Sequence, residues 1–115
     1  MNRYCIVIEL KEEFIEQYCD IHRNPWLELL RSIKDGGAEE LLIWNYKNLS
    51  IVYYECEDLD ALYEKRKKLE VSKKWNITVG PWFKTTLPID SEGKFITCEK
   101  IFDLNQQLEG SLKPY

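Results

Sequence analysis

The chain has 115 residues, of which 44% are hydrophobic and 31% are charged, a profile that fits one globular domain with a modest core. Its net charge of −4 argues against a general nucleic-acid binder, which needs a surplus of Lys and Arg to neutralise phosphates. No apolar run approaches the roughly 20 residues that cross a bilayer, and the apolar segment 5–10 is too short for a signal peptide. We therefore expect no nucleic-acid partner and no membrane partner.

The cysteine and histidine content limits the kinds of site that the chain can build. Cys5, Cys19, Cys56 and Cys98 are widely spaced without a C-x-x-C pair, and His22 is the only histidine. This usage favours a reduced, cytoplasmic protein over a disulfide framework and argues against a zinc site. No segment has calcium-loop spacing or a nucleotide-binding glycine motif. We expect no metal and no other cofactor, although a carboxylate-only Mg²⁺ or Ca²⁺ site stays open.

The hydrophobic periodicity changes several times along the chain, from the period of a strand to that of a helix and back. The predicted elements are a strand at 4–10, a helix from 12 to 23, a second helix from 25 to 35, strands at 40–45 and 48–57, a third helix at 61–75 with a break near 71–72, and a last strand at 94–104.

Local signals support the boundaries of these elements. Asn-Pro at 24–25 separates the first two helices, because Pro disfavours the α conformation in the residue before it and is favoured at the first helical position. Gly-Gly at 36–37 is a typical helix end. A short turn at 46–48 joins the middle strands into a hairpin. Asp58 or Asp60 can cap the third helix.

The resulting order, β-α-β-β-α-β, predicts an α+β domain of the ferredoxin-like kind, with a four-stranded antiparallel sheet and helices on one face. Residues 1–104 form this single domain, and residues 105–115 form a C-terminal tail without clear periodicity. Apolar residues occupy consecutive positions at 5–8 and 41–44, so both faces of the sheet need cover. One small domain cannot supply it, and we expect a homodimer in which two sheets pack face to face.

Tyr18 and His22 are the first candidates for chemistry. They lie four residues apart on one helix face, within reach of a common ligand. Histidine can take or give a proton near neutral pH, and a tyrosine hydroxyl can bind a substrate oxygen or assist the transfer. A lone histidine is more often a partly buried helix residue with a satisfied hydrogen bond. The spacing alone does not decide between these roles.

Four Trp and seven Tyr are many for a chain of this length. Tryptophan faces can stack on sugars, but an aromatic core is the commoner role. Trp26 and Trp44 are interpreted as core residues, whereas Trp75 lies among polar residues in "SKKWN" and is a candidate for ligand contact. The basic run at 64–74 lacks interleaved aromatics and is interpreted as a solvated helix face.

The pattern Y-x-x-x-H-x-x-x-W-x-E, formed by Tyr18, His22, Trp26 and Glu28, resembles the signature of the L-rhamnose mutarotase family. The similarity continues in "GGAEELLI", "NLSIVYYE" and "CEKIFDL" and spans residues 3–104 in one consistent order. The resemblance implies a dimeric α+β barrel of ferredoxin-like subunits. It also implies a cofactor-free isomerase that interconverts the α and β anomers of L-rhamnose, or of a related 6-deoxy sugar, by general acid/base ring opening.

The resemblance also carries residue roles onto this chain. The family's proton-donating histidine maps onto His22, and its substrate-binding tyrosine maps onto Tyr18. Its adjacent tryptophan pair falls on Trp75 and Asn76, and a further tyrosine on the strand after Gly-Ala falls on Leu41. Two of these five positions therefore depart from the family pattern.

These departures leave open which sugar is bound and whether activity is retained. Trp44 is the nearest aromatic residue to Leu41, but strand alternation places it on the opposite sheet face. One alternative is a catalytically weak or inactive protein that binds a sugar or another small molecule. Another is a different dimeric α+β barrel, such as a monooxygenase-like or heme-handling protein, in which His22 would serve differently.

Overall fold

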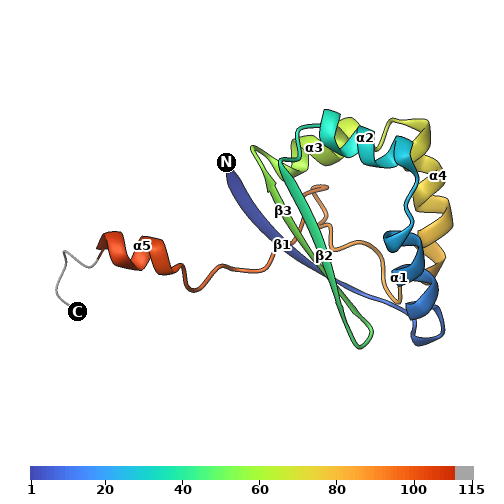
Figure 1. The fold of residues 1–115 in the computed structure, drawn as a ribbon, viewed down its shortest axis with the longest axis horizontal. Coiled ribbons are helices and arrows are strands. Elements are labelled where there is room, and N and C mark those ends of the chain that lie inside the picture. The colour runs from blue at the N-terminus through green and yellow to red at the C-terminus, as the bar shows by residue number, and fades with distance from the viewer. Residues whose placement is uncertain (111–115) are drawn as a thin grey trace.

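The computed structural model describes residues 1–110, in which helices lie on one face of an antiparallel sheet (Figure 1). This confirms the α+β class. None of the helices in the described part of the chain is long and apolar enough to span a membrane. In chain order the elements are β1 (Asn2–Glu9), the 3₁₀ helix η1 (Glu12–Phe14), α1 (Ile15–Arg23), α2 (Leu27–Asp35), β2 (Glu40–Tyr46), β3 (Leu49–Cys56), α3 (Leu59–Arg66), α4 (Glu70–Val79), the 3₁₀ helix η2 (Gly80–Trp82) and α5 (Leu104–Glu109).

The sheet has the strand order β1-β3-β2, and both strand pairs are antiparallel. Because side chains alternate along a strand, cross-strand neighbours form rows that belong to one face or the other. The row that faces the helices at the centre of the sheet is Ile6–Val52–Ile43, and the next row on the outer face is Val7–Ile51–Trp44. The inner rows, together with side chains from the helices, build the core.

The predicted fourth strand is wrong, since the sheet has three strands. Residues 94–104 contain no strand, although the amide of Cys98 donates to the carbonyl of Cys5 in β1 over 2.7 Å. A ladder needs a series of such bonds, but the amide of Ile96 instead donates to Pro88 within a local turn. The chain then leaves the sheet as an arm (Figure 1).

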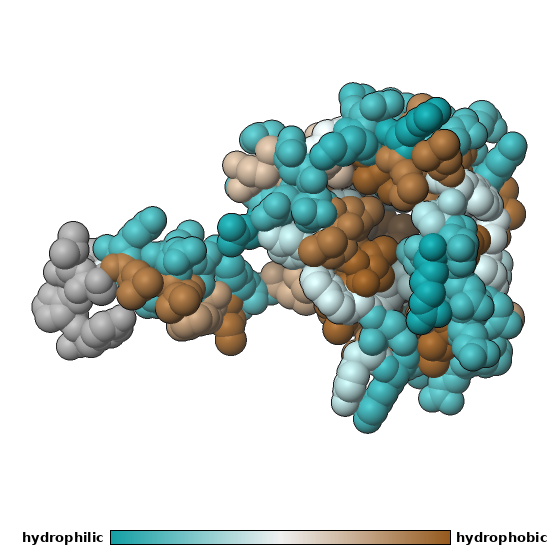
Figure 2. Space-filling model, in the orientation of Figure 1, coloured by the Kyte–Doolittle hydropathy of each residue, from teal (hydrophilic) through white to brown (hydrophobic). Residues whose placement is uncertain are grey.

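The described part of the predicted C-terminal tail, residues 105–110, lies in this arm. Most of it belongs to α5, which begins at Leu104, and Asp103 caps the first turn by accepting from the amide of Gln106 over 3.0 Å. The rest of the tail, residues 111–115, lies outside the described residues. Apolar side chains follow the arm in Figure 2, and Ile101 and Phe102 are 88% and 65% exposed.

Most predicted helix boundaries are confirmed. The chain breaks between α1 and α2 at 24–25, and Gly37 has a φ of 112°, the left-handed conformation expected after α2. Asp58 caps α3 by accepting from the amide of Ala61 over 3.1 Å. The predicted break of the third helix exists, but it lies at 67–69 and not near 71–72, which fall inside α4, and α4 continues to Val79. Trp26, rather than Asn24, is the residue immediately before α2.

The outer sheet face is apolar and exposed. Trp44 is 55% exposed and Leu42 is 40% exposed, so the prediction of Trp44 as a core residue is wrong. It does point away from Leu41, as alternation requires, because Leu41 is half-buried on the helix side. This bare face, Val7, Leu42, Trp44 and Tyr46, is called the outer apolar face below.

Candidate functional site

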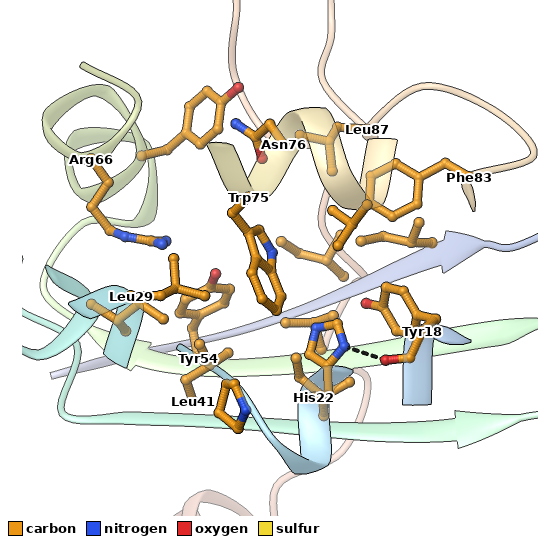
Figure 3. A pocket seen from close by; sticks show the side chains of 18 of the residues that line it. Tyr18, His22, Leu29, Leu41, Tyr54, Arg66, Trp75, Asn76, Phe83 and Leu87 are labelled. Atoms are coloured by element: carbon orange, nitrogen blue, oxygen red, sulfur yellow. Dashed lines mark hydrogen bonds between the residues drawn. The ribbon is translucent and has the colours of Figure 1, made fainter. Parts of the chain in front are cut away.

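A cavity of about 450 Å³ lies between the helix-facing side of the sheet and the helices, and Figure 2 shows a hollow bordered by apolar side chains there. This volume falls in the range of small-molecule sites. Apolar side chains make up most of its lining, among them Ile6, Ile43 and Val52 of the sheet. The polar and aromatic groups that converge on it include Tyr18, His22, Tyr54, Arg66, Trp75 and Asn76 (Figure 3).

His22 lies in the last turn of α1 and is held by a hydrogen bond inside its own helix. Its Nδ1 lies 2.6 Å from the backbone carbonyl of Tyr18, and because a carbonyl only accepts, Nδ1 carries the proton. In the neutral ring, Nε2 is then the basic nitrogen. Burial lowers the pKa of His22 below its usual value, and the bond to the carbonyl opposes this only in part. The site therefore holds a neutral imidazole with one available lone pair.

Tyr18 is buried beside His22, with the two ring centroids 4.2 Å apart. Its hydroxyl lies 2.7 Å from Oγ of Ser50 on β3, a side chain with no exposed surface. Burial raises the pKa of Tyr18, and the bond to Ser50 offsets only part of that effect. Tyr18 thus stays protonated near neutral pH. Its hydrogen bond to Ser50 holds the phenol ring in place, and the imidazole of His22 packs against that ring.

The structure brings the other predicted site residues to the same cavity. Trp75 of α4 meets the His22 ring edge to face with centroids 5.2 Å apart, and it meets Trp26 in the same way. Asn76 follows it and is exposed at the cavity rim, and Leu41 lines the sheet side. Trp26 therefore packs against Trp75, and Trp75 in turn packs against the imidazole of His22 (Figure 3).

Three cavity or wall residues were not predicted from the sequence: Ser50, Tyr54 and Arg66. Ser50 and Tyr54 share the inner face of β3, and the register sets Tyr54 directly opposite Leu41. Tyr54 thus lies next to Leu41, the position at which the family pattern has a tyrosine. The sequence did carry a signal for Ser50 and Tyr54. Ser50, Val52 and Tyr54 are alternate residues of one strand and so share a sheet face, and two of the three have a hydroxyl group.

Arg66 belongs to the basic run at 64–74, which was interpreted from the sequence as a solvated helix face, so its place in the cavity was not predicted. Helical spacing from the buried Leu59 and Leu62 places it on the inner side of α3, whereas Lys65 is exposed. That spacing was the signal available in the sequence. Separately, no group of three or more His, Cys, Asp or Glu side chains suited to a metal occurs within residues 1–110.

The cavity chemistry predicts a distinctive pH dependence. If neutral His22 is the base, kcat/KM corrected for spontaneous exchange should rise with pH to a plateau, with its midpoint below the usual histidine pKa of 6.5. The sign follows because the basic form predominates above the pKa, and burial moves that pKa down. With one histidine in the chain, its ¹⁵N shifts should report the Nδ1–H tautomer at pH 7. Activity that rises as pH decreases through this range would contradict the assignment.

Comparisons with known proteins agree with this geometry. The model of the L-rhamnose mutarotase family matches residues 3–104. The solved L-rhamnose mutarotase of Formosa agariphila aligns with a TM-score of 0.66 at 19% identity, covering 90% of this chain and 98% of that one. Tetracenomycin F2 cyclase of Streptomyces glaucescens, a type-II polyketide cyclase, aligns with a TM-score of 0.55 at 16% identity, covering 90% and 96%. No curated protein matched the sequence. The two structural likenesses establish a shared fold.

Proposed function

The chain belongs to the L-rhamnose mutarotase family and is a carbohydrate isomerase, and on that premise we propose that His22 and Tyr18 carry the ring opening of L-rhamnose or a related 6-deoxy sugar. One observation supports this most directly: the Nδ1 bond to the Tyr18 carbonyl leaves Nε2 of His22 as the basic nitrogen beside a largely apolar cavity of ligand size. Spontaneous mutarotation needs only acid and base, so a positioned imidazole is sufficient.

The reaction moves one proton between two oxygens. Nε2 of His22 takes the proton of the anomeric hydroxyl while the bond between C1 and the ring oxygen breaks. The electron pair of that bond goes to the ring oxygen, which receives the proton from the imidazolium. Rotation about C1–C2 exposes the other face of the aldehyde, and the reverse transfer closes the ring. Both oxygens are attached to C1, so one nitrogen can serve both.

The remaining residues hold the sugar in this scheme. Tyr18 orients the reacting end, because its hydroxyl is fixed by Ser50 and stays protonated. Trp75 offers an apolar surface to the C–H groups of the sugar and Asn76 offers an amide at the rim. Leu41 contributes an apolar contact where a tyrosine would have added a hydroxyl. No bound cofactor is needed for this proton transfer.

A panel of free sugars tests the proposal. L-rhamnose, L-fucose and D-glucose are each incubated with the protein, and anomer exchange is measured by saturation-transfer NMR alongside ligand-induced thermal shift. Exchange proportional to protein concentration for a 6-deoxy sugar is the expected result. Thermal shift without exchange would support instead the alternative of a sugar-binding protein with little or no turnover.

We also propose that the chain acts as a homodimer in the form of a dimeric α+β barrel, with the outer apolar face of one copy packed on that of another. Helices cover only one side of the sheet (Figure 1), and the row Val7–Ile51–Trp44 runs across all three strands on the other. Exposed apolar patches of this kind mark interaction surfaces. A twofold arrangement buries the same patch on both copies.

The dimer predicts a clear effect of charge on the outer apolar face. Trp44→Glu should convert the dimer into a monomer in sedimentation equilibrium, because burying an unpaired carboxylate in an interface is costly. Gln17→Glu adds the same charge on the exposed side of α1 and should leave the mass unchanged. A monomeric wild type, or a Trp44→Glu variant that stays dimeric, would contradict the arrangement.

Residues 1–104 are proposed as the catalytic domain and residues 105–115 as a C-terminal tail. A cytoplasmic location is proposed because Cys5, Cys19 and Cys56, and the exposed Cys98, are all free thiols.

A further inference from the structure

We propose that Arg66 and Tyr54 form an anion-binding subsite in the sugar cavity, and that the cavity accepts hexuronates, sugars that carry a carboxylate, besides uncharged 6-deoxy sugars. The inference rests on the proposed function only in placing the anomeric carbon at His22. Figure 3 shows Arg66 and His22 on opposite sides of Trp75, so the two residues can contact different parts of one ligand.

Among the described residues, no carboxylate compensates the charge of Arg66. Arg23 also lines the cavity, but it pairs with Asp20 over 3.1 Å at the surface. Within residues 1–110 Arg66 has no ion pair with a carboxylate, and no Asp or Glu lines the cavity. Its Nε is buried without a hydrogen-bond partner. Arg66 is half-buried, and a partly desolvated charge without a carboxylate partner is unfavourable, so an anionic ligand is the partner that suits the site.

Tyr54 completes a set of donors. Tyr54 lines the same cavity as Arg66, and the nearby guanidinium favours the ionised form of its hydroxyl only in part. Burial raises the pKa of Tyr54, so the hydroxyl keeps its proton. A guanidinium beside a hydroxyl donor is the arrangement that binds a planar oxyanion.

Packing directs Arg66 inward. A Cβ at Gly36, the residue after α2, would lie 3.3 Å from Cγ of Arg66 and 2.7 Å from Cδ1 of Leu62. The stem of Arg66 therefore runs close over Gly36 instead of extending to solvent. By contrast Lys67, the next residue, pairs with Glu64 at the surface over 2.9 Å. The inward placement is specific to Arg66 within the basic run.

A single guanidinium suits a monoanion better than a phosphate dianion, and among residues 1–110 the other arginine of the cavity lining, Arg23, is already paired with Asp20. A hexuronate carries its carboxylate at C5, on the other side of the ring oxygen from the anomeric carbon. One pyranose can therefore contact His22 with its hemiacetal and Arg66 with its carboxylate. Ring opening at C1 is the same chemistry whether C5 carries a methyl group or a carboxylate.

The test compares each acid with its own neutral ester, which removes differences in ring stereochemistry. Binding of D-galacturonate and L-guluronate, and of their methyl esters, is measured by isothermal titration calorimetry. In the wild type the carboxylate should bind about 10-fold or more tightly than the ester, as expected for hydrogen bonds to charged groups. The ratio should approach one in Arg66→Met and stay at the wild-type value in Lys65→Gln, which removes an exposed charge from the same helix.

Equal binding of acid and ester to the wild type, or an unchanged ratio in Arg66→Met, would overturn the proposal. D-galactose 6-phosphate that binds more tightly than D-galacturonate would also overturn it, by assigning the subsite to phosphate. Circular dichroism and thermal melting check the fold of each variant, and Tyr54→Phe, with an expected smaller loss of the ratio, serves if Arg66→Met does not fold. Binding is measured without turnover, so absence of anomer exchange would refute the proposed function alone.

Discussion

His22→Gln is expected to lower the rate of L-rhamnose anomer exchange by about 10²–10⁴-fold, the usual contribution of a positioned acid or base. Glutamine keeps a polar side chain of similar length but cannot take a proton near neutral pH. Saturation-transfer NMR at matched protein concentration gives the rate. Glu16→Gln, on the exposed side of the same helix, serves as the matched control and should retain the wild-type rate.

Two readouts separate a chemical role of His22 from a structural one. Sugar binding, measured by titration calorimetry, should change little in His22→Gln, and the melting temperature should stay near that of the wild type. Loss of exchange together with loss of folding would leave only a structural role. Undiminished exchange in a well-folded His22→Gln variant would refute the catalytic assignment.

Tyr18→Phe is expected to cost about 1–3 kcal/mol of unfolding free energy, because it leaves the hydroxyl of Ser50 buried without its partner. The double variant Tyr18→Phe/Ser50→Ala removes both polar groups and should recover most of that loss. Urea denaturation of the wild type, both single variants and the double variant gives the coupling. Additive losses would show that the hydrogen bond contributes nothing to stability.

The same variants carry a functional readout. The proposed contact between Tyr18 and the sugar predicts that anomer exchange stays reduced in the double variant, even where stability recovers. Recovery of both quantities together would assign Tyr18 a purely structural role.

The local pattern of the sequence predicted most of the elements. Helical spacing set Tyr18 above His22, and the structure brings their rings to 4.2 Å. The Asn-Pro break at 24–25 and the glycine at 37 ended helices where expected. These features depend on the backbone preferences of a few consecutive residues, and such preferences can be inferred from the residue types alone.

The features that sequence missed depend on residues brought together by folding. Pairing of the segment 94–104 with β1 needed free amides at the right places, and the local turn around Pro88 uses one of them. Trp44 looked like a core residue because its strand is apolar on both faces, and a sequence does not state which face the helices cover. Tertiary context decided both outcomes.

The candidate site shows the same division. The β2–β3 register places Tyr54 across from Leu41, and Arg66, whose stem runs close to Gly36, lines the same cavity. Position 41 alone suggested a lost polar contact. In the folded chain Tyr54, on the adjacent strand, places a hydroxyl-bearing side chain opposite Leu41. This part of the cavity wall therefore keeps a polar group, supplied by a different strand.

Anomer exchange of L-rhamnose by the wild-type chain, compared with His22→Gln in the same buffer at pH 7, is the most direct measurement of the central claim. Acceleration above the spontaneous rate, proportional to wild-type concentration and reduced by about 10²-fold or more in the variant, is the predicted result. Exchange at the spontaneous rate in the presence of folded, sugar-bound wild-type protein would contradict it.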